Sequence, residues 1–330
     1  HIHLDRIEFP RSFLSLFSKI GMNWITIPSA IKNSAIKRSS ASIIAKQLGI
    51  NELTIGLTVV ALGTSAPEIF VGISSIINES ESLAMGAVVG SNISNIALIF
   101  GVSCIGIAAK PKKTPLVQFV PFLLSSFILG YALIDLSISK FESVLLLIIF
   151  LYFIYVTYQN RSNDDQMKED SFPEEGSIYT IFALLFGLIA LVAGSNYAVV
   201  YAEKIAVLLK ISELVIGLTI IAIGTSLPEL AATISAVIKK KTDMVVGNVI
   251  GSNVLNITLV VPIIGFFSNV QLDSLILSRD FFVMIIATIL FVIIGISYSS
   301  KAFGINSIKL VGLILVSSYL IYILSLSSLI

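Results

Sequence analysis

The chain has 330 residues, of which 56% are hydrophobic and 12% charged, with a mean hydropathy of +0.97 and a formal net charge of +1. A soluble protein carries about 25% charged residues, so the composition predicts an integral membrane protein, and the small net charge gives no support for nucleic-acid binding. The single cysteine, Cys104, excludes an internal disulfide. Both histidines lie at the N-terminus, at positions 1 and 3, so no zinc, haem or triad chemistry is expected.

Apolar runs of about 20 residues are long enough to cross a bilayer. In chain order we expect spans at about 53–77, 83–109, 115–134, 143–159, 178–201, 213–238, 244–268, 281–298 and 307–327. Residues 12–31 are a weak first span, within an atypical N-terminal segment, 1–33, that we expect to be truncated or frame-shifted. The sequence thus predicts an all-α integral membrane protein of ten transmembrane helices whose first helix is degraded.

A hydrophilic segment at 160–177 separates two membrane halves, 34–159 and 178–330. Its six acidic residues lack the Asp-x-Asp-x-Asp-Gly pattern of a calcium loop. We therefore expect a solvated linker there.

The two halves contain copies of one sequence. With a shift of 161 positions, NELTIGLTVVALGTSAPEIF (51–70) falls on SELVIGLTIIAIGTSLPELA (212–231), and MGAVVGSNISNIAL (85–98) falls on VGNVIGSNVLNITL (246–259). Over 51–96 and 212–257, 22 of 46 positions are identical without a gap. The agreement at Gly, Thr, Ser, Pro, Glu and Asn indicates a duplication, with repeats at about 51–102 and 212–263.

The distribution of basic residues predicts how the halves are oriented. Five spans per half is an odd number, so the second half would enter the membrane in the opposite direction. With the N-terminus outside, 14 of the 21 Lys and Arg residues fall in inner loops and four in outer loops, as the positive-inside rule requires. We expect two inverted five-helix repeats, as in many secondary transporters, in the cell membrane, with the 160–177 loop in the cytoplasm.

Two acidic residues, Glu68 and Glu229, lie in the middle of predicted spans at matching positions of the repeats; the other acids lie in loops, span ends or tails. A charge at this depth is costly, which makes each glutamate a functional candidate. Because no Lys, Arg or His is expected at comparable depth, the partner of these carboxylates would be a mobile cation, a proton or water.

Each glutamate ends a Gly-Thr-Ser-x-Pro-Glu motif. Glycine permits a bend and proline frees a backbone carbonyl, so these motifs predict broken helices at the midplane that line a cavity. The helix-break residues are Gly63, Pro67, Gly224 and Pro228. A second motif, Gly-Ser-Asn-x-x-Asn at 90–95 and 251–256, adds hydroxyl and amide oxygens. Such an all-oxygen set favours Ca²⁺ and Na⁺ over Zn²⁺ or Cu⁺.

Simpler explanations exist for one copy of these motifs. Ser65-x-x-Glu68 is also a capping box, and the glycine spacings are also typical of close helix packing. Two inverted copies, each with a mid-span acid, favour an ion site.

These motifs resemble those of the calcium/cation antiporter superfamily, and within it the prokaryotic-type sodium/calcium exchangers. The resemblance implies that Glu68 and Glu229 are carboxylates shared by Ca²⁺ and Na⁺. It implies further ligands of four kinds: carbonyls and hydroxyls of Thr64 and Thr225, hydroxyls of Ser65, Ser226, Ser91 and Ser252, carbonyls of Ala61 and Ala222, and central amides of Asn95 and Asn256.

The sequence departs from this family in two places. Some members, including potassium-dependent ones, carry Asp at the position of Asn256, so K⁺ co-transport is not expected. Residues 12–33 do not resemble the family's first gating helix, whereas the inverted counterpart at 181–209 is long and apolar.

The expected function is therefore exchange of Na⁺ for Ca²⁺ by alternating access, in which the first and sixth spans slide across a fixed core. No enzyme activity, cofactor or obligate protein partner is expected, and we expect the lipid bilayer to surround the helices. A Ca²⁺/H⁺ antiporter stays open as an alternative, although the Thr-Ser pair beside each proline favours Na⁺. A cation channel is disfavoured by the lack of a selectivity-filter run, and an intramembrane enzyme by the lack of a buried base.

Overall fold

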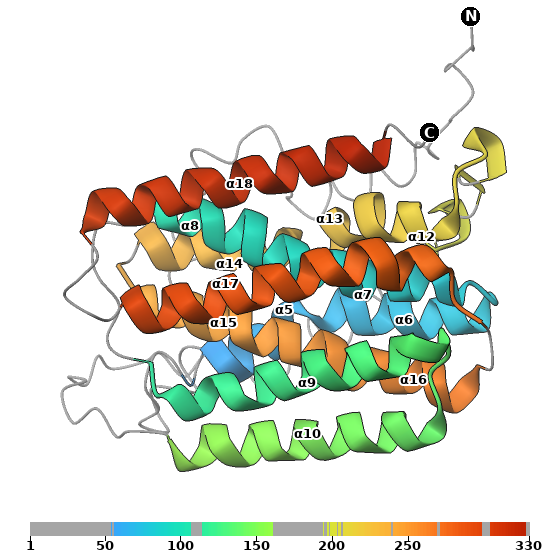
Figure 1. Cartoon of the computed structure of the whole chain (residues 1–330), viewed down its shortest axis with the longest axis horizontal. Coiled ribbons are helices and arrows are strands. Elements are labelled where there is room, and N and C mark those ends of the chain that lie inside the picture. Colours follow the sequence, from blue (N-terminus) through green and yellow to red (C-terminus); the bar gives the residue numbers. More distant parts are fainter. Residues whose placement is uncertain are drawn as a thin grey trace, which may run out of the picture.

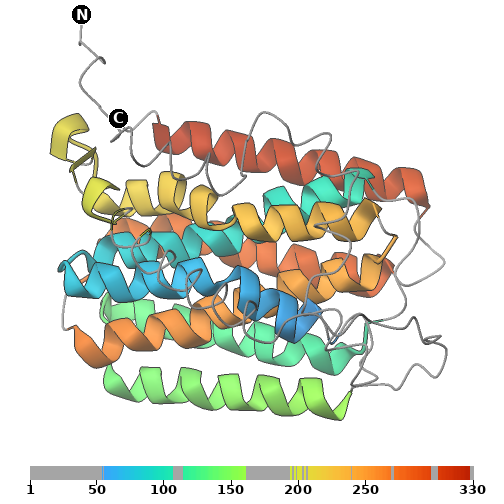
Figure 2. The same cartoon turned by 180° about the vertical axis from the view of Figure 1, so that it is seen from behind.

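The computed structural model describes residues 54, 56–106, 114–160, 211–238, 240–268, 271–298 and 304–327, together with 194, 197, 199–202, 204, 205 and 207–210. Every regular element in these residues is a helix, and most run side by side along the long axis of the molecule (Figures 1 and 2). Within the described residues, six helices are long and apolar enough to cross a membrane, or seven if one bent pair is a single span. The all-α membrane fold is confirmed. The predicted first span, the 160–177 loop after its first residue and the beginning of the sixth span lie outside the described residues, so the count of ten stays a prediction.

The first half consists of a broken helix followed by three continuous spans. Its elements are η2 (Gly56–Val60), α5 (Ala61–Thr64) and α6 (Ala66–Ile77); α7 (Glu81–Ser94), η3 (Asn95–Phe100) and α8 (Gly101–Gly106); η4 (Leu116–Gln118), α9 (Phe119–Ala132) and η5 (Leu133–Asp135); and α10 (Lys140–Gln159).

The second half repeats this order. Its elements are α12 (Glu213–Ile216), η6 (Gly217–Ile221), α13 (Ala222–Thr225) and α14 (Leu227–Ile238); α15 (Thr242–Leu255), η7 (Asn256–Val260) and α16 (Val261–Phe267); η8 (Ile276–Phe281) and α17 (Phe282–Tyr298); and α18 (Ile305–Ser327). With the shift of 161, the bounds of η2, α5, α6 and α7 coincide residue for residue with those of η6, α13, α14 and α15. The duplication seen in the sequence is therefore a duplication of structure.

The two copies run in opposite directions. In Figure 1 the chain passes from α5 to α6 towards the right end of the molecule, whereas it passes from α12 and α13 to α14 towards the left end. The halves also pack reciprocally: α7 of the first lies against α12 and η6 of the second, and α15 of the second lies against η2 and α5 of the first. The inverted arrangement that the lysine and arginine distribution predicts is present in the fold.

Glycines permit the closest of these crossings. A Cβ at Gly90 would lie 2.7 Å from the carbonyl oxygen of Leu218 and 2.7 Å from the Cβ of Ala222. At the matching Gly251, a Cβ would lie 2.6 Å from the Leu57 carbonyl oxygen and 2.6 Å from the Cβ of Ala61. The glycine that opens each Gly-Ser-Asn motif thus lets the motif's helix approach the broken helix of the other half.

Burial separates a central group of helices from a peripheral one. The spans Glu81–Gly106 and Thr242–Phe267 are each 83% buried, whereas Ile276–Ser297 is 39% and Ile305–Leu326 is 28% buried. The peripheral helices present large apolar side chains outward, which suits contact with lipid; examples are Phe127, Leu151, Ile293, Leu313 and Ile321. The two Gly-Ser-Asn motifs therefore lie in the protein interior.

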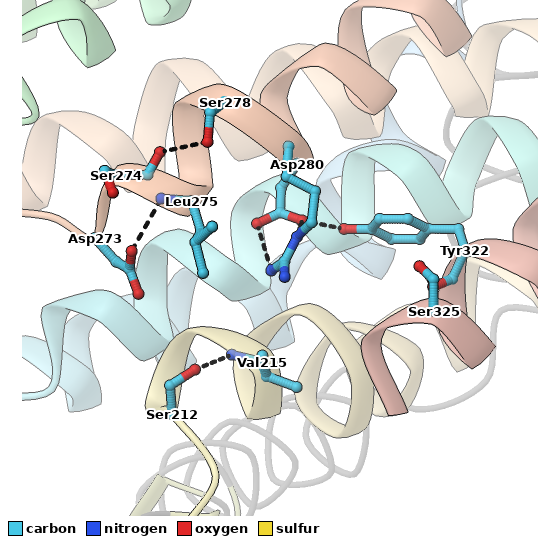
Figure 3. A network of polar contacts seen from close by, with 10 residues as sticks. Ser212, Val215, Asp273, Ser274, Leu275, Ser278, Asp280, Tyr322 and Ser325 are labelled. Carbon is cyan, nitrogen blue, oxygen red and sulfur yellow. Dashed lines mark hydrogen bonds and ion pairs between the residues drawn. The ribbon is translucent and has the colours of Figure 1, made fainter. Parts of the chain in front are cut away.

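A polar cluster joins two peripheral helices at one end. The fully buried carboxylate of Asp280 accepts hydrogen bonds from the Nε of Arg279 at 2.7 Å, from its Nη2 at 3.0 Å and from the hydroxyl of Tyr322 at 2.8 Å (Figure 3). Asp280 and Arg279 lie in η8, and Tyr322 lies in α18. Arg279 thus lies in the first turns of a span, and its charge is compensated by Asp280.

Candidate ion-binding site

Both Gly-Thr-Ser-x-Pro-Glu motifs break their helices, at the serine. Ser65, with φ −83° and ψ 3°, separates α5 from α6, and Ser226, with φ −81° and ψ 1°, separates α13 from α14. Pro67 lies in the first turn of α6, where the absence of an N–H group is tolerated. The second broken helix is bent by 42°. Gly63 lies within the helical turn of α5, and a Cβ there would meet no atom within 4 Å.

The break places each glutamate in the first turn of a new helix. Glu68 lies in the first turn of α6 and Glu229 in the first turn of α14, where the positive end of the helix dipole favours an anion. Their exposed fractions are only 2% and 1%. Since α6 and α14 belong to opposite halves, one carboxylate from each half points into the centre of the fold.

Glu229 is contacted by both halves. Its Oε1 accepts a hydrogen bond from the Ser65 hydroxyl of the first half at 3.1 Å and from the Ser252 hydroxyl of its own half at 3.5 Å. Thr64 also lies beside this carboxylate. The hydroxyls of the first broken helix thus face the acid of the second.

Most of the carboxylate oxygens lack a protein donor. Neither oxygen of Glu68 accepts a hydrogen bond, and the Oε2 of Glu229 accepts none, although all three atoms are buried. The two carboxylates also lie close enough to repel each other. Among the described residues, the side chains that interact with these two carboxylates include no Lys, Arg or His. A buried anion without compensation costs several kcal/mol, so this centre is suited to a cation.

The threonine and serine hydroxyls complete one side of the centre. Thr225 lies beside Glu68, and its Oγ1 is 3.4 Å from the Oγ of Ser91. The same Thr225 hydroxyl is 3.0 Å from the Ile221 carbonyl oxygen, to which it donates. Ser226 has a buried hydroxyl without a protein partner. Each glutamate is therefore lined by hydroxyl oxygens of the opposite half.

The second pair of motifs adds amide groups. The Nδ2 of Asn95 donates to the Oδ1 of Asn253 at 3.1 Å, across the two halves. The Oδ1 of Asn95 and both polar atoms of Asn256 are buried without a protein partner. Asn253 is absent from the sequence-based candidates, although the identical Asn at the third position of both Gly-Ser-Asn motifs was a signal for it.

The backbone widens beside the amides. Asn95 begins the π-helix η3, and Asn256 begins the π-helix η7. The π-helices η2 and η6 end directly before Ala61 and Ala222. Local π-helical turns occur frequently at functional sites, because they alter the i→i−4 hydrogen-bond ladder.

The two alanine carbonyls already accept hydrogen bonds in their own turns. The Ala61 oxygen accepts from the Ser65 N–H at 2.8 Å and from the Thr64 hydroxyl at 3.3 Å. The Ala222 oxygen accepts from the Ser226 N–H at 3.1 Å and from the Thr225 hydroxyl at 3.4 Å. Their role as ion ligands stays a prediction.

The centre is rich in oxygen and poor in charge. The part of the chain that the structure describes contains no group of three or more His, Cys, Asp and Glu side chains that could hold a metal ion. Two carboxylates surrounded by neutral hydroxyl and amide oxygens suit hard cations, and they resemble neither a zinc site nor a thiolate site.

Comparisons with known proteins agree with this geometry. The model of the sodium/calcium exchanger protein family matches residues 29–159 and 179–327. The inner membrane protein YrbG of Escherichia coli is 36% identical over 265 residues, which cover 77% of this chain and 82% of YrbG. The sodium/calcium exchanger MaX1 of Methanosarcina acetivorans is 32% identical over 313 residues, with 82% and 89% of the two chains covered.

A solved structure has the same fold. The sodium-calcium exchanger NCX_Mj, soaked with 10 mM Na⁺ and 10 mM Sr²⁺, superposes with a TM-score of 0.65 at 29% identity, and the match covers 86% of this chain and 90% of NCX_Mj. The putative antiporter CaxA of Alkalimonas amylolytica is 34% identical over 290 residues, covering 86% of this chain and 90% of CaxA. With two inverted halves that meet at paired glutamates, the chain belongs to the sodium/calcium exchanger family of membrane antiporters.

Proposed function

We propose that this antiporter exchanges Na⁺ for Ca²⁺ and that Glu68 and Glu229 bind both ions. The observation that carries the proposal is the set of three buried carboxylate oxygens without a protein donor, contributed by two inverted halves. The ions would be bound by these oxygens together with the hydroxyl, amide and backbone oxygens of the four motifs.

Charge provides the coupling between the two ions. Two ionised glutamates carry a charge of −2, which one Ca²⁺ balances. Sodium ions on the same carboxylates and on the neighbouring Ser and Thr hydroxyls would displace Ca²⁺ because the ligands overlap. Occupancy by one ion then excludes the other, and the fluxes are coupled without covalent chemistry.

Alternating access would use the difference between the central and peripheral helices. The crossings of α7 with η6 and of α15 with η2 are close and deeply buried, which suits a fixed core. The first and sixth predicted spans would slide across this core and open it to one side at a time. Most Lys and Arg residues fall in loops on one predicted side of the cell membrane. By the positive-inside rule this side is the cytoplasm, which places the N-terminus outside and the 160–177 loop in the cytoplasm.

A Ca²⁺/H⁺ antiporter is the second candidate. The observation that favours it is the burial of both carboxylates with three oxygens that lack a protein donor, since protons can neutralise these groups as metal ions can. Protons would then replace Na⁺ at the same two residues. The neutral hydroxyls at Thr64, Ser65, Thr225 and Ser226 favour Na⁺, because a proton needs no shell of oxygen ligands.

One experiment separates the two candidates. Purified protein is reconstituted into vesicles loaded with Na⁺ and diluted into Na⁺-free buffer that contains Ca²⁺, at equal pH on both sides. Calcium uptake driven by the Na⁺ gradient is expected, with none in K⁺-loaded vesicles. Uptake that requires a pH gradient and ignores Na⁺ would establish the proton antiporter instead.

A further inference from the structure

A groove of about 470 Å³ lies between α8 and α14, and neither glutamate lines it. Its helices α8 and α14 end on the left of the molecule in Figure 1, where α10 also ends and α15 and α18 begin. Two helices and the turn that follows α14 line it. The lining residues used below are Ser103 and Gly106 of α8, Ile234, Val237 and Ile238 of α14, and Lys240 of the turn.

The groove is apolar, and part of its lining is exposed at the surface of the protein. Ile234 is 42% and Ile238 67% exposed. The hydroxyl of Ser103 donates to the Phe100 carbonyl at 2.6 Å, so it adds no free polar group to the lining. The two helices touch near Gly106, where a Cβ would lie 3.2 Å from Val237. The lining that remains is mostly apolar, which suits a hydrocarbon chain.

Lys240 lines the groove at its rim and carries a positive charge. Lys240 has a left-handed backbone, with φ 57°, and its N–H donates to the Val237 carbonyl at 2.9 Å. The turn therefore holds Lys240 directly over the end of α14. Its hinge, 239–243, carries three lysines and one aspartate, so the local charge is positive.

The inverted repeat supplies an internal comparison. With the shift of 161, Gly106 corresponds to Phe267, Ser103 to Ile264 and Lys240 to Glu79. Glu79 has φ 58°, so the turn has the same backbone at both ends of the molecule. The opposite end therefore replaces two small residues by large apolar ones and the cation by an anion. The size of these side chains and the sign of the charge therefore differ between the two ends of the molecule.

The geometry points to a binding site for an anionic phospholipid, with one acyl chain between α8 and α14 and the phosphate on Lys240. Lysines next to a membrane surface attract anionic headgroups, and basic pockets between membrane helices bind them. A zwitterionic lipid would fill the groove equally well but would gain less from Lys240. This site is separate from the ion-binding centre and does not depend on the counter-ion.

Quenching of a tryptophan by brominated lipids tests the site. Ile238→Trp places a reporter at the groove, and Trp24→Phe removes the chain's single tryptophan. The full-length protein is reconstituted in phosphatidylcholine vesicles that contain either brominated phosphatidylglycerol or the same fraction of brominated phosphatidylcholine. We expect phosphatidylglycerol to occupy the groove about five-fold more strongly, the ratio that corresponds to the ~1 kcal/mol of one Lys near an anionic surface.

Two further comparisons make the test decisive. The reporter Ile77→Trp, at the matching position of the other end, should show no preference for phosphatidylglycerol. Lys240→Glu should abolish the preference at Ile238→Trp, and Gly106→Phe should reduce quenching by both lipids because it fills the groove. Equal quenching by both lipids at Ile238→Trp, or a preference that survives Lys240→Glu, would show ordinary annular lipid and overturn the proposal.

Discussion

The Ser65 hydroxyl of the first half donates to the Glu229 carboxylate of the second at 3.1 Å, but the matching Ser226 hydroxyl makes no such bond to Glu68. The two halves share their helix bounds but differ in the polar contacts at their centre. This difference sets the first of the predictions below.

Ser65→Ala should lower the free energy of unfolding of the protein without Na⁺ and Ca²⁺ by about 2 kcal/mol, because a hydrogen bond to a charged group is lost. Ser226→Ala is the matched control and should leave stability unchanged, because its hydroxyl has no protein partner. Thermal unfolding in chelator and Na⁺-free buffer measures both. Equal destabilisation by the two variants would contradict the asymmetry.

Glu68→Gln and Glu229→Gln should each reduce Na⁺-driven Ca²⁺ uptake roughly 100-fold or more, since loss of a charged ligand costs about 3 kcal/mol. Each change removes half of the charge that balances Ca²⁺. Uptake into Na⁺-loaded vesicles measures the effect, and Glu79→Gln on an exposed turn is the control that should retain full uptake. Normal exchange by either interior variant would remove the glutamates from the ion site.

Gly90→Ala and Gly251→Ala should destabilise the protein by about 1–3 kcal/mol, the range for overpacked cores. The added Cβ would lie within 2.7 Å of the opposing backbone or Cβ, so the crossing helices must separate. Gly63→Ala and Gly224→Ala are the controls: no atom lies within 4 Å of a Cβ there, and alanine favours the helix. A fluorescence-detected melting curve for the four variants should separate the two pairs.

Arg279→Gln should destabilise the protein by about 3 kcal/mol, because the fully buried Asp280 carboxylate loses its counter-charge. Tyr322→Phe, which removes one hydrogen bond, should cost about 1 kcal/mol. Since this cluster lies in peripheral helices, Ca²⁺ exchange by the protein that remains folded should persist. The double change Arg279→Gln with Asp280→Asn should recover part of the stability, and no recovery would mean that the ion pair does not govern the loss.

The sequence predicted the repeat and the main acids because these features are local and identical in both copies. Gly-Thr-Ser-x-Pro-Glu marks a break in an apolar helix wherever it occurs, and a shift of 161 aligns the two breaks without any knowledge of packing. The inverted orientation followed from counting lysines and arginines in loops. Both conclusions depend on positions along the chain alone.

The remaining features depend on packing between segments distant in the chain. The contact between Asn95 and Asn253 joins residues 158 apart, and nothing in either motif alone selects its partner. In the sequence Asp280 is an acid at the end of a span, and only the packing of α18 shows that Tyr322 donates to it. The break occurs at Ser65 rather than Gly63, because helical geometry continues until the turn before the proline.

Because the two halves share their helix bounds, each half can in principle adopt the conformation that the other half has now. If each half adopts the present shape of its partner, the hydrogen bond from Ser65 to Glu229 is replaced by one from Ser226 to Glu68, and the molecule faces the other side of the membrane. The two states would then differ by an exchange of equivalent contacts, with little net gain or loss in their number. Two states of similar free energy suit a carrier, because the protein must not remain open to one side of the membrane only.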